Sequence, residues 1–369
     1  MAKLADDAAR TAALRVRLLE WYRNYRRELP WRGSTDPYAI WVSEIMLQQT
    51  RVAVVVERYQ AFLARFPTLV SLALAAEQEV LALWSGLGYY RRARMLHKAA
   101  QFVAEHLAGN LPAQAVELRR LPGIGTYTAA AMASIAHGEA VAVVDGNVER
   151  VLCRFAGWET GSRKGGGAEL RRKVEDLAQR LLDRAHPGDF NQAMMDLGAM
   201  VCTPRNPQCL TCPLMADCKT RGEHRTPRRV PMTSRVAAYA LSVRAGPEQG
   251  TPDANSREVL LEQRPAQMTV MPGMWELPAL RNQDLPANEV RMTLRHAIMQ
   301  VNYYVRIRAV AEGDVKATTL KGGKRRWVPL REAAGMALTG LTRKVLARAH
   351  LLRLPPVNVI APGAGKDAF

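Results

Sequence analysis

Four cysteines lie close together near the middle of the chain, and their spacing constrains the local fold more than any other feature. Cys202, Cys209, Cys212 and Cys218 are separated by six, two and five residues. Four thiolates this close can hold one zinc ion or a 4Fe-4S cluster. Zinc modules more often use two CxxC pairs, and here only Cys209 and Cys212 form one. The pattern therefore favours an iron–sulfur cluster in a reducing compartment.

The chain also carries a large excess of basic side chains. Its 369 residues include 52 Lys and Arg against 34 Asp and Glu, a formal net charge of +18. This excess predicts a polyanionic partner, either nucleic acid or an acidic membrane surface. The sequence contains no run of about 18 apolar residues, and its first residues lack the apolar core of a signal peptide. We therefore expect a cytoplasmic protein with access to DNA and no membrane partner.

Hydrophobic periodicity predicts a helical first domain over residues 1–221. Apolar residues make up 48% of the chain, enough to bury a sizeable core. The helical stretches with apolar periodicity are 37–49, 51–65, 92–107, 126–136, 146–156 and 169–183. Cys153 falls in one of these stretches beside Val151 and Leu152, so it is predicted to be a small core residue.

A polar, basic segment with two prolines, residues 222–235, is predicted to be a linker. After it the pattern changes to short apolar runs typical of strands, at 236–243, 259–261 and 301–310. Helical sequence returns near 331–352. These features predict a separate α+β domain over 236–353. The remaining residues, 354–369, are rich in Pro, Gly and Ala and are predicted to be a disordered tail.

A glycine-rich turn lies between two helical stretches, at residues 121–129. Gly123 and Gly125 permit a tight turn and a close approach of the backbone to a ligand. The unpaired N–H groups that start the next helix suit a phosphate. An ordinary connection between helices would use glycines in the same way. The net positive charge favours phosphate binding, and the segment resembles the helix–hairpin–helix of DNA-repair enzymes.

Two carboxylic acids are candidates for catalysis. Asp145 lies between an apolar run and a helix, where Asp commonly serves as an N-cap. Glu44, although most Glu residues lie on the surface, would have mainly apolar neighbours on a helix. Partial burial would raise its pKa and let it hold a proton near neutral pH. Cleavage of a glycosidic bond needs one such acid and one ionised carboxylate, so the pair has the right chemistry if the fold brings it together.

The glycine-rich turn, Asp145 and the cysteine spacing together resemble the endonuclease III superfamily. Further stretches resemble the MutY family within it, namely 29–32, 36–38, 41–50, 86–90 and 191–198. The resemblance covers residues 14–220 and implies an all-α helix–hairpin–helix glycosylase core with a 4Fe-4S cluster on the four cysteines. It also implies a base-excision repair enzyme acting on double-stranded DNA. The implied reaction removes adenine mispaired with 8-oxoguanine or guanine by hydrolysis of the N-glycosidic bond.

The resemblance implies a role for each matched residue of the reaction. Glu44 matches the acid that protonates adenine, and Asp145 matches the carboxylate that faces the deoxyribose cation. Tyr127 and Asn147 match residues that support them. Bifunctional relatives carry a lysine at the position of Tyr127, whose amine forms a Schiff base with the sugar. Because tyrosine cannot form that imine, the chain is predicted to be monofunctional.

Other matched residues would contact the DNA bases. The positions around the extruded adenine are matched by Arg27, Arg32 and Gln192. The residues that wedge into the base stack are matched by Gln49 and Tyr89. Extruding a base costs about a few kcal/mol, and side chains that fill the gap offset part of that cost.

The C-terminal domain resembles the Nudix-type domain of the same family, through 257–264 and 272–278. Ala279 stands where a Nudix pyrophosphatase would carry a glutamate, so the implied role is recognition of 8-oxoguanine. The family usually has His-x-Phe-Ser-His in its recognition loop. Here His296 matches, but Ile298, Met299 and Gln300 replace the last three residues. Gln300 could hydrogen bond and Ile298 could make apolar contact, and the strictness of 8-oxoguanine preference stays open.

Two other functions remain as alternatives. A bifunctional endonuclease III-like glycosylase/lyase is disfavoured by Tyr127 and by the C-terminal domain. A non-catalytic iron–sulfur DNA-binding protein is disfavoured by the presence of both Glu44 and Asp145. We expect a monomer associated with the nucleoid.

Overall fold

The computed structural model describes residues 2–159, 167–222, 231–246, 257–280, 285–298, 300–311 and 323–352. The chain divides into two compact units with interleaved segments. Unit 1 comprises residues 1–49, 63–74 and 95–229, and unit 2 comprises residues 50–62, 75–94 and 230–369. Two segments of the helical region thus pack with the C-terminal part of the chain. The contiguous domain limits inferred from the sequence stay a prediction.

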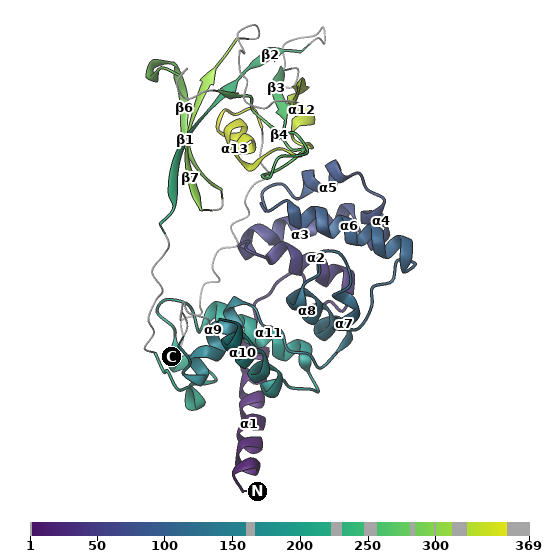
Figure 1. The fold of residues 1–369 in the computed structure, drawn as a ribbon, viewed down its shortest axis with the longest axis vertical. Helices are drawn as coiled ribbons and strands as arrows, with labels where there is room; N and C mark the ends of the chain where they lie inside the picture. Colours follow the sequence, from purple (N-terminus) through teal and green to yellow (C-terminus); the bar gives the residue numbers. More distant parts are fainter. Residues whose placement is uncertain are drawn as a thin grey trace. The chain divides into compact units, whose positions relative to one another are not determined.

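The first two hundred residues are helical, as predicted (Figure 1). The helices are α1 (Ala2–Tyr25), α2 (Pro37–Leu47), α3 (Val52–Arg65), α4 (Leu69–Ala73), α5 (Glu77–Leu83), α6 (Arg91–His106), α7 (Ala115–Leu118), α8 (Thr126–His137), α9 (Gly146–Ala156), α10 (Gly167–Leu181) and α11 (Pro187–Met200). Local sequence sets where several of them start. The Asp36 side chain caps α2, and Pro37 occupies its first turn, where no backbone donor is needed.

Helix α11 lies at the centre of unit 1 and packs against α1, α8 and α9. Its side chains Phe190 and Leu197 are buried in one apolar cluster with Leu18 of α1 and Leu152 of α9. The burial of each such side chain contributes about 1.5–3 kcal/mol to the free energy of unfolding. Cys153 is only 1% exposed within this cluster, which confirms that it is a core residue.

The glycine-rich turn joins the short helix α7 to α8, which contact each other. Gly123 has a φ of +76°, and a Cβ added there would lie 2.7 Å from the Cβ of Met95. Gly125 has an extended backbone and forms the N-cap of α8, with open space around its Cα. The turn between the helices therefore requires glycine at 123 for both backbone conformation and packing. At position 125, glycine places no side chain over the first turn of α8.

Unit 2 contains the strands of the C-terminal region (Figure 1). They are β1 (Thr233–Leu241), β2 (Val243–Ala245), β3 (Arg257–Gln263), β4 (Trp275–Glu276), β5 (Ala279–Leu280), β6 (Val290–Ile298), β7 (Val301–Ala309) and β8 (Lys324–Pro329), followed by helices α12 (Leu330–Ala333) and α13 (Gly340–Arg348). Among the described residues one sheet has the order β5-β1-β7-β6, and the second has β3 between β2 and β4 with β8 also paired to β3. Strands β6 and β7 form an antiparallel hairpin, and β1 runs parallel to β7.

The mixture of strands and helices confirms the predicted α+β character of this region, with small changes at its borders. Strand β1 begins at Thr233, inside the predicted linker. The linker residues 223–230 and the predicted tail 354–369 lie outside the described residues. In the part of the chain that the structure describes, no helix combines the length and apolarity needed to cross a bilayer.

Replacement of Gly123 by alanine tests the packing of the helix–hairpin–helix. Gly123→Ala should lower the free energy of unfolding by about 1–3 kcal/mol, because it strains a positive φ and forces Met95 to move. Gly125→Ala is the matched control, since its added methyl group meets no atom, and its stability should fall by no more than about 1 kcal/mol, the usual cost of alanine at an N-cap. Chemical denaturation measures both. Equal effects of the two substitutions would contradict this account.

Candidate active site

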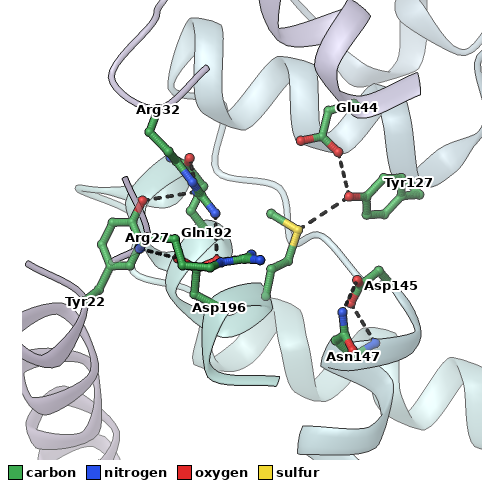
Figure 2. A network of polar contacts seen from close by, with 10 residues as sticks. Tyr22, Arg27, Arg32, Glu44, Tyr127, Asp145, Asn147, Gln192 and Asp196 are labelled. Carbon is green, nitrogen blue, oxygen red and sulfur yellow. Dashed lines mark hydrogen bonds and ion pairs between the residues drawn. The ribbon is translucent and has the colours of Figure 1, made fainter. Parts of the chain in front are cut away.

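Glu44 lies on α2 with its side chain inside unit 1. It is only 5% exposed, as its apolar neighbours on the helix predict. The Tyr127 hydroxyl of α8 donates a hydrogen bond to Glu44 Oε2 at 2.6 Å (Figure 2). Burial raises the pKa of Glu44, an effect that the Tyr127 hydrogen bond and the Arg32 charge oppose and the Asp145 charge reinforces. The site can therefore hold a carboxylic acid that keeps its proton to higher pH than an exposed glutamate.

Tyr127 occupies the first turn of α8, directly after the glycine-rich turn. Its hydroxyl also lies 3.4 Å from the Met195 sulfur. Burial, together with the nearby Glu44 carboxylate, raises the pKa of Tyr127 well above its ordinary value of 10.0. The hydroxyl is thus a neutral donor at any physiological pH. It fixes the orientation of Glu44 and cannot act as a base.

Asp145 is held in a different environment, at the N-terminus of α9. As the N-cap it accepts backbone hydrogen bonds on Oδ1 from Asn147 at 2.9 Å and from Val148 at 2.7 Å. The Asn147 side chain donates to Oδ2 at 3.1 Å, as Figure 2 shows. Both carboxylate oxygens are therefore oriented by N–H donors. The partial positive charge of the helix N-terminus adds to this effect.

Arg150 connects Asn147 to the segment that carries the cysteines. Its Nη2 donates to Asn147 Oδ1 at 3.0 Å and to the Gly198 carbonyl at 2.6 Å. Its Nε donates to the Cys202 carbonyl at 2.9 Å. Gly198 allows the close approach of α11, because an added Cβ would lie 2.7 Å from the Cβ of Asn147. A continuous chain of hydrogen bonds thus runs from Asp145 through Asn147 and Arg150 to Cys202.

A second polar group lies beside the carboxylates and is organised by Asp196. This residue is fully buried, and Oδ1 accepts from Arg27 Nη2 at 2.5 Å and Arg32 Nη2 at 2.8 Å. Arg32 also donates to the Gln192 side-chain oxygen and to the Tyr22 hydroxyl. Figure 2 shows these residues gathered around Asp196. The two arginines are therefore paired and fixed in direction, as buried charges require.

The four cysteines line one pocket together with Arg154, Val201, Met215 and Arg221. Cys202 follows α11, and the other three lie on two short 3-10 helices, η1 (Cys209–Thr211) and η2 (Met215–Asp217), or at their ends. Arg154 Nη1 lies 3.4 Å from the Cys202 sulfur, so a cationic donor is available to thiolates. Four thiols around one pocket are the ligand set of a 4Fe-4S cluster, and the nearby cations would offset the negative charge of thiolates.

The remaining predicted DNA-contacting residues that the structure describes lie in turns or at the end of a strand. Gln49 follows α2, is exposed, and has a φ of +56°. Tyr89 lies between α5 and α6 in unit 2, 46% exposed, with a φ of +47°. Ile298 ends β6 and lines a pocket of unit 2 together with Tyr89 and His296. The Gln300 carbonyl accepts from the Thr233 backbone at 3.0 Å, and Met299 lies outside the described residues.

The structure thus brings together Glu44, Tyr127, Asp145 and Asn147, and beside them Arg27, Arg32 and Gln192. Sequence reasoning missed the residues that hold this set, namely Tyr22, Arg150, Met195 and Asp196. Two of them lie one helical turn away from a predicted site residue, and this spacing could have identified them from the sequence. Asp196 follows Gln192 by one helical turn on α11, and Arg150 follows Asn147 by one turn on α9.

Two family models and a solved structure match parts of the chain. A family model of the HhH-GPD superfamily of base excision DNA repair proteins matches residues 42–179. A model of the iron–sulfur binding domain of endonuclease III matches residues 202–218. The solved structure of a thermostable thymine-DNA glycosylase matches 58% of this chain and 98% of its own, with 29% identity and a TM-score of 0.53. Residues 42–179 thus form a core of the HhH-GPD type, and the four clustered cysteines form an endonuclease III-type 4Fe-4S binding domain.

Within that superfamily the chain is similar to adenine DNA glycosylases. It is 44% identical over 269 residues to the Homo sapiens protein, a match that covers 70% of this chain and 47% of the relative. It is 41% identical over 235 residues to the Arabidopsis thaliana protein, covering 57% of this chain and 37% of the relative. The chain therefore spans about half the length, or less, of these curated relatives.

Replacement of Glu44 by glutamine tests whether its pKa is raised. Because burial raises the pKa of Glu44 above 4.5, the folded protein binds this proton more tightly than the unfolded chain does. The contribution of Glu44 should therefore lower the free energy of unfolding progressively as pH rises from 4.5 through the raised pKa. Glu44→Gln removes that cost, keeps an oxygen for Tyr127, and should melt higher than the wild type at neutral pH but not below pH 4.5. Calorimetry from acid to neutral pH measures this difference, and a difference independent of pH would contradict it.

Proposed function

We propose that this protein is a monofunctional adenine DNA glycosylase of base excision repair. Its substrate would be adenine opposite 8-oxoguanine or guanine in double-stranded DNA. The observation that carries the proposal is the pair of carboxyl groups in different environments, with Glu44 buried against Tyr127 and Asp145 oriented by N–H groups. Similarity to adenine DNA glycosylases supports the choice of adenine.

The reaction needs a proton on the leaving base and negative charge near the sugar. In the proposed mechanism, protonated Glu44 donates to a ring nitrogen of the extruded adenine, which makes the base a better leaving group. The N-glycosidic bond breaks and leaves an oxocarbenium-like deoxyribose. Asp145 stabilises this cation from its N-cap position. Water then adds to the sugar and gives up a proton that restores the carboxylic acid of Glu44, so the products are free adenine and an abasic site.

Strand cleavage is not part of the proposed reaction. A lyase step needs an amine that attacks the sugar and forms a Schiff base. In this chain Tyr127 stands at the hairpin position where bifunctional relatives carry lysine, and its hydroxyl is committed to Glu44. The proposed enzyme therefore stops at the abasic site.

The extruded adenine would be held by the polar group around Asp196. Arg32 and Gln192 are bonded to each other, and the amide of Gln192 offers both a donor and an acceptor for the base edge. Arg27 is fixed in direction by Asp196. This arrangement favours an uncharged base with paired donor and acceptor atoms, and adenine has both.

Recognition of the opposite base is assigned to the pocket of unit 2 that contains Tyr89, His296 and Ile298. Ile298 offers an apolar contact, and burial lowers the pKa of His296, with Lys344 adding to the effect. His296 would then be neutral at physiological pH and could donate or accept one hydrogen bond. Because Ile298 and Gln300 stand in place of the family's Phe and His, we expect a smaller preference for 8-oxoguanine over guanine than the usual pattern provides.

Binding to the DNA backbone would use the N-terminus of α8 at the glycine-rich turn, where open space around Gly125 leaves backbone N–H groups accessible to a phosphate. The 4Fe-4S cluster, held by the four cysteines, would cross-link the loop that follows α11. We propose that the protein acts as a monomer on nucleoid DNA in the cytoplasm.

A single-turnover assay tests the proposed function. Labelled duplexes carry adenine opposite 8-oxoguanine, guanine or thymine, and products are resolved with and without alkali. We expect cleavage after alkali for the first two duplexes and none for the third. Glu44→Gln and Asp145→Asn should each lower the rate by about 10²–10⁴-fold. No cleavage by cluster-loaded protein would favour a DNA-binding role, and cleavage without alkali would favour a lyase.

The pH dependence of the rate tests the role of Tyr127. The Tyr127 hydrogen bond lowers the pKa of Glu44 against the larger effect of burial. In Tyr127→Phe this opposition is lost, so Glu44 should keep its proton to higher pH. The alkaline limb of the pH–rate profile should therefore move upward, although the maximal rate falls because Glu44 is less well oriented. An unchanged or downward-shifted limb would contradict the assigned role of Tyr127.

A further inference from the structure

The turn that carries Tyr89 has an unusual backbone. Tyr89 has a φ of +47°, and it follows Gly86 at +100° and Gly88 at +71°. Glycine adopts these conformations freely, but a tyrosine there is strained. Such a residue persists only when its surroundings determine the conformation. The contacts of this turn within unit 2 show which groups do so.

Arg92, at the start of α6, contacts this turn from several directions. Its Nη2 donates to the carbonyl groups of Leu87 and Gly88, both at 3.2 Å. The guanidinium also stacks on two aromatic rings, 5.5 Å from the centre of Trp84 and 5.6 Å from that of Tyr89. Burial lowers the pKa of Arg92 to about 10, so it remains charged at neutral pH. One cation thus holds both the backbone and the ring of the turn.

The same guanidinium reaches a second turn. Arg92 Nη2 donates to Thr50 Oγ1 at 3.0 Å, and Thr50 Oγ1 donates to the Leu87 carbonyl at 3.2 Å. Thr50 directly follows Gln49, the other predicted wedge residue, which also has a positive φ. Within unit 2, Arg92 therefore contacts both the Tyr89 ring and the side chain of Thr50.

Arg343 of α13 supports the turn from the C-terminal region of unit 2. Its Nε donates to Ser85 Oγ at 2.8 Å. The hydroxyl groups of Ser85 and Tyr90 lie 3.4 and 3.2 Å from the Leu338 carbonyl, which accepts from them. Ser85 is fully buried, and Arg343 is 9% exposed. Both sides of Tyr89 are thereby anchored to the segment 338–343.

We propose that Arg92 and Arg343 are positioning residues that hold Tyr89 ready to enter the base stack before DNA binds. The inference rests on the proposed function, because it takes Tyr89 as the wedge. A preformed wedge lowers the cost of extruding a paired adenine, since its side chain need not be ordered during extrusion. When the base opposite adenine is missing, the base stack is already interrupted, and a preformed wedge lowers the cost of extrusion only slightly. The C-terminal region then supports adenine extrusion as well as recognition of the opposite base.

The test compares two duplexes under single-turnover conditions with cluster-loaded, full-length protein. In one, adenine lies opposite 8-oxoguanine, and in the other it lies opposite an abasic-site analogue. We expect Arg92→Met and Arg343→Met to lower the rate on the paired duplex by about tenfold to a hundredfold. On the interrupted duplex the loss should be less than about threefold. A merely structural role would lower both rates equally, and that result would overturn the proposal.

Two further variants make the test specific. Arg65→Met removes another cation–π contact, on Phe66 at 5.1 Å, and should leave both rates unchanged. Arg92→Met combined with Tyr89→Ala should be no slower than Tyr89→Ala alone, because the arginine acts through that side chain. Additive losses would overturn the proposal.

If Arg92→Met does not fold, Arg92→Lys keeps the charge without the planar fork and provides the same comparison. A wild-type protein inactive on both duplexes would refute the proposed function instead.

Discussion

The proposed active site depends on the hydrogen bond between the Tyr127 hydroxyl and the Glu44 carboxyl. It joins α8 to α2 inside unit 1, where water does not compete for the carboxyl group. A buried carboxylate is costly unless it is protonated or hydrogen bonded. Burial therefore favours the protonated form, and the tyrosine fixes the direction in which the group points. The same apolar neighbours that stabilise the helices make Glu44 suitable as an acid.

Asp145 shows how one fold gives the same chemical group a different task. Its oxygens accept from the backbone N–H groups of Asn147 and Val148 and from the Asn147 amide. In the proposed mechanism, this difference in environment separates the two carboxyl groups into an acid and a group that stabilises the sugar cation. Arg150 donates hydrogen bonds to both Asn147 and the Cys202 carbonyl, and so connects the surroundings of Asp145 to Cys202. The iron–sulfur binding segment is thus connected by hydrogen bonds to the residues that position Asp145.

The sequence contained most of the site, because its chemistry is carried by local patterns. The burial of Glu44 follows from its neighbours on one helix, and the capping role of Asp145 follows from its position before α9. The clustering of four cysteines follows from their spacing. These features need no knowledge of how distant segments meet.

What could not be predicted are contacts that join distant segments. Asp196 and Arg27 are far apart in the chain, and only the packing of α11 against α1 brings them together. The pairing of Arg343 with Ser85 requires the C-terminal region to pack with residues 75–94. The sequence pattern of either segment gives no sign of this packing. Hydrophobic periodicity identifies which residues are buried but not which partners they bury against.

The central claim, that burial makes Glu44 keep its proton to higher pH than an exposed glutamate does, is tested most directly by titrating this one carboxyl group. Carbon-13 NMR of glutamate-labelled protein, with Glu44→Gln identifying the resonance, follows its protonation without reference to activity. We predict a titration midpoint above the ordinary value of 4.5. A midpoint at or below 4.5 would contradict it. Glu44 would then be a buried anion and would need another source for the proton that adenine receives.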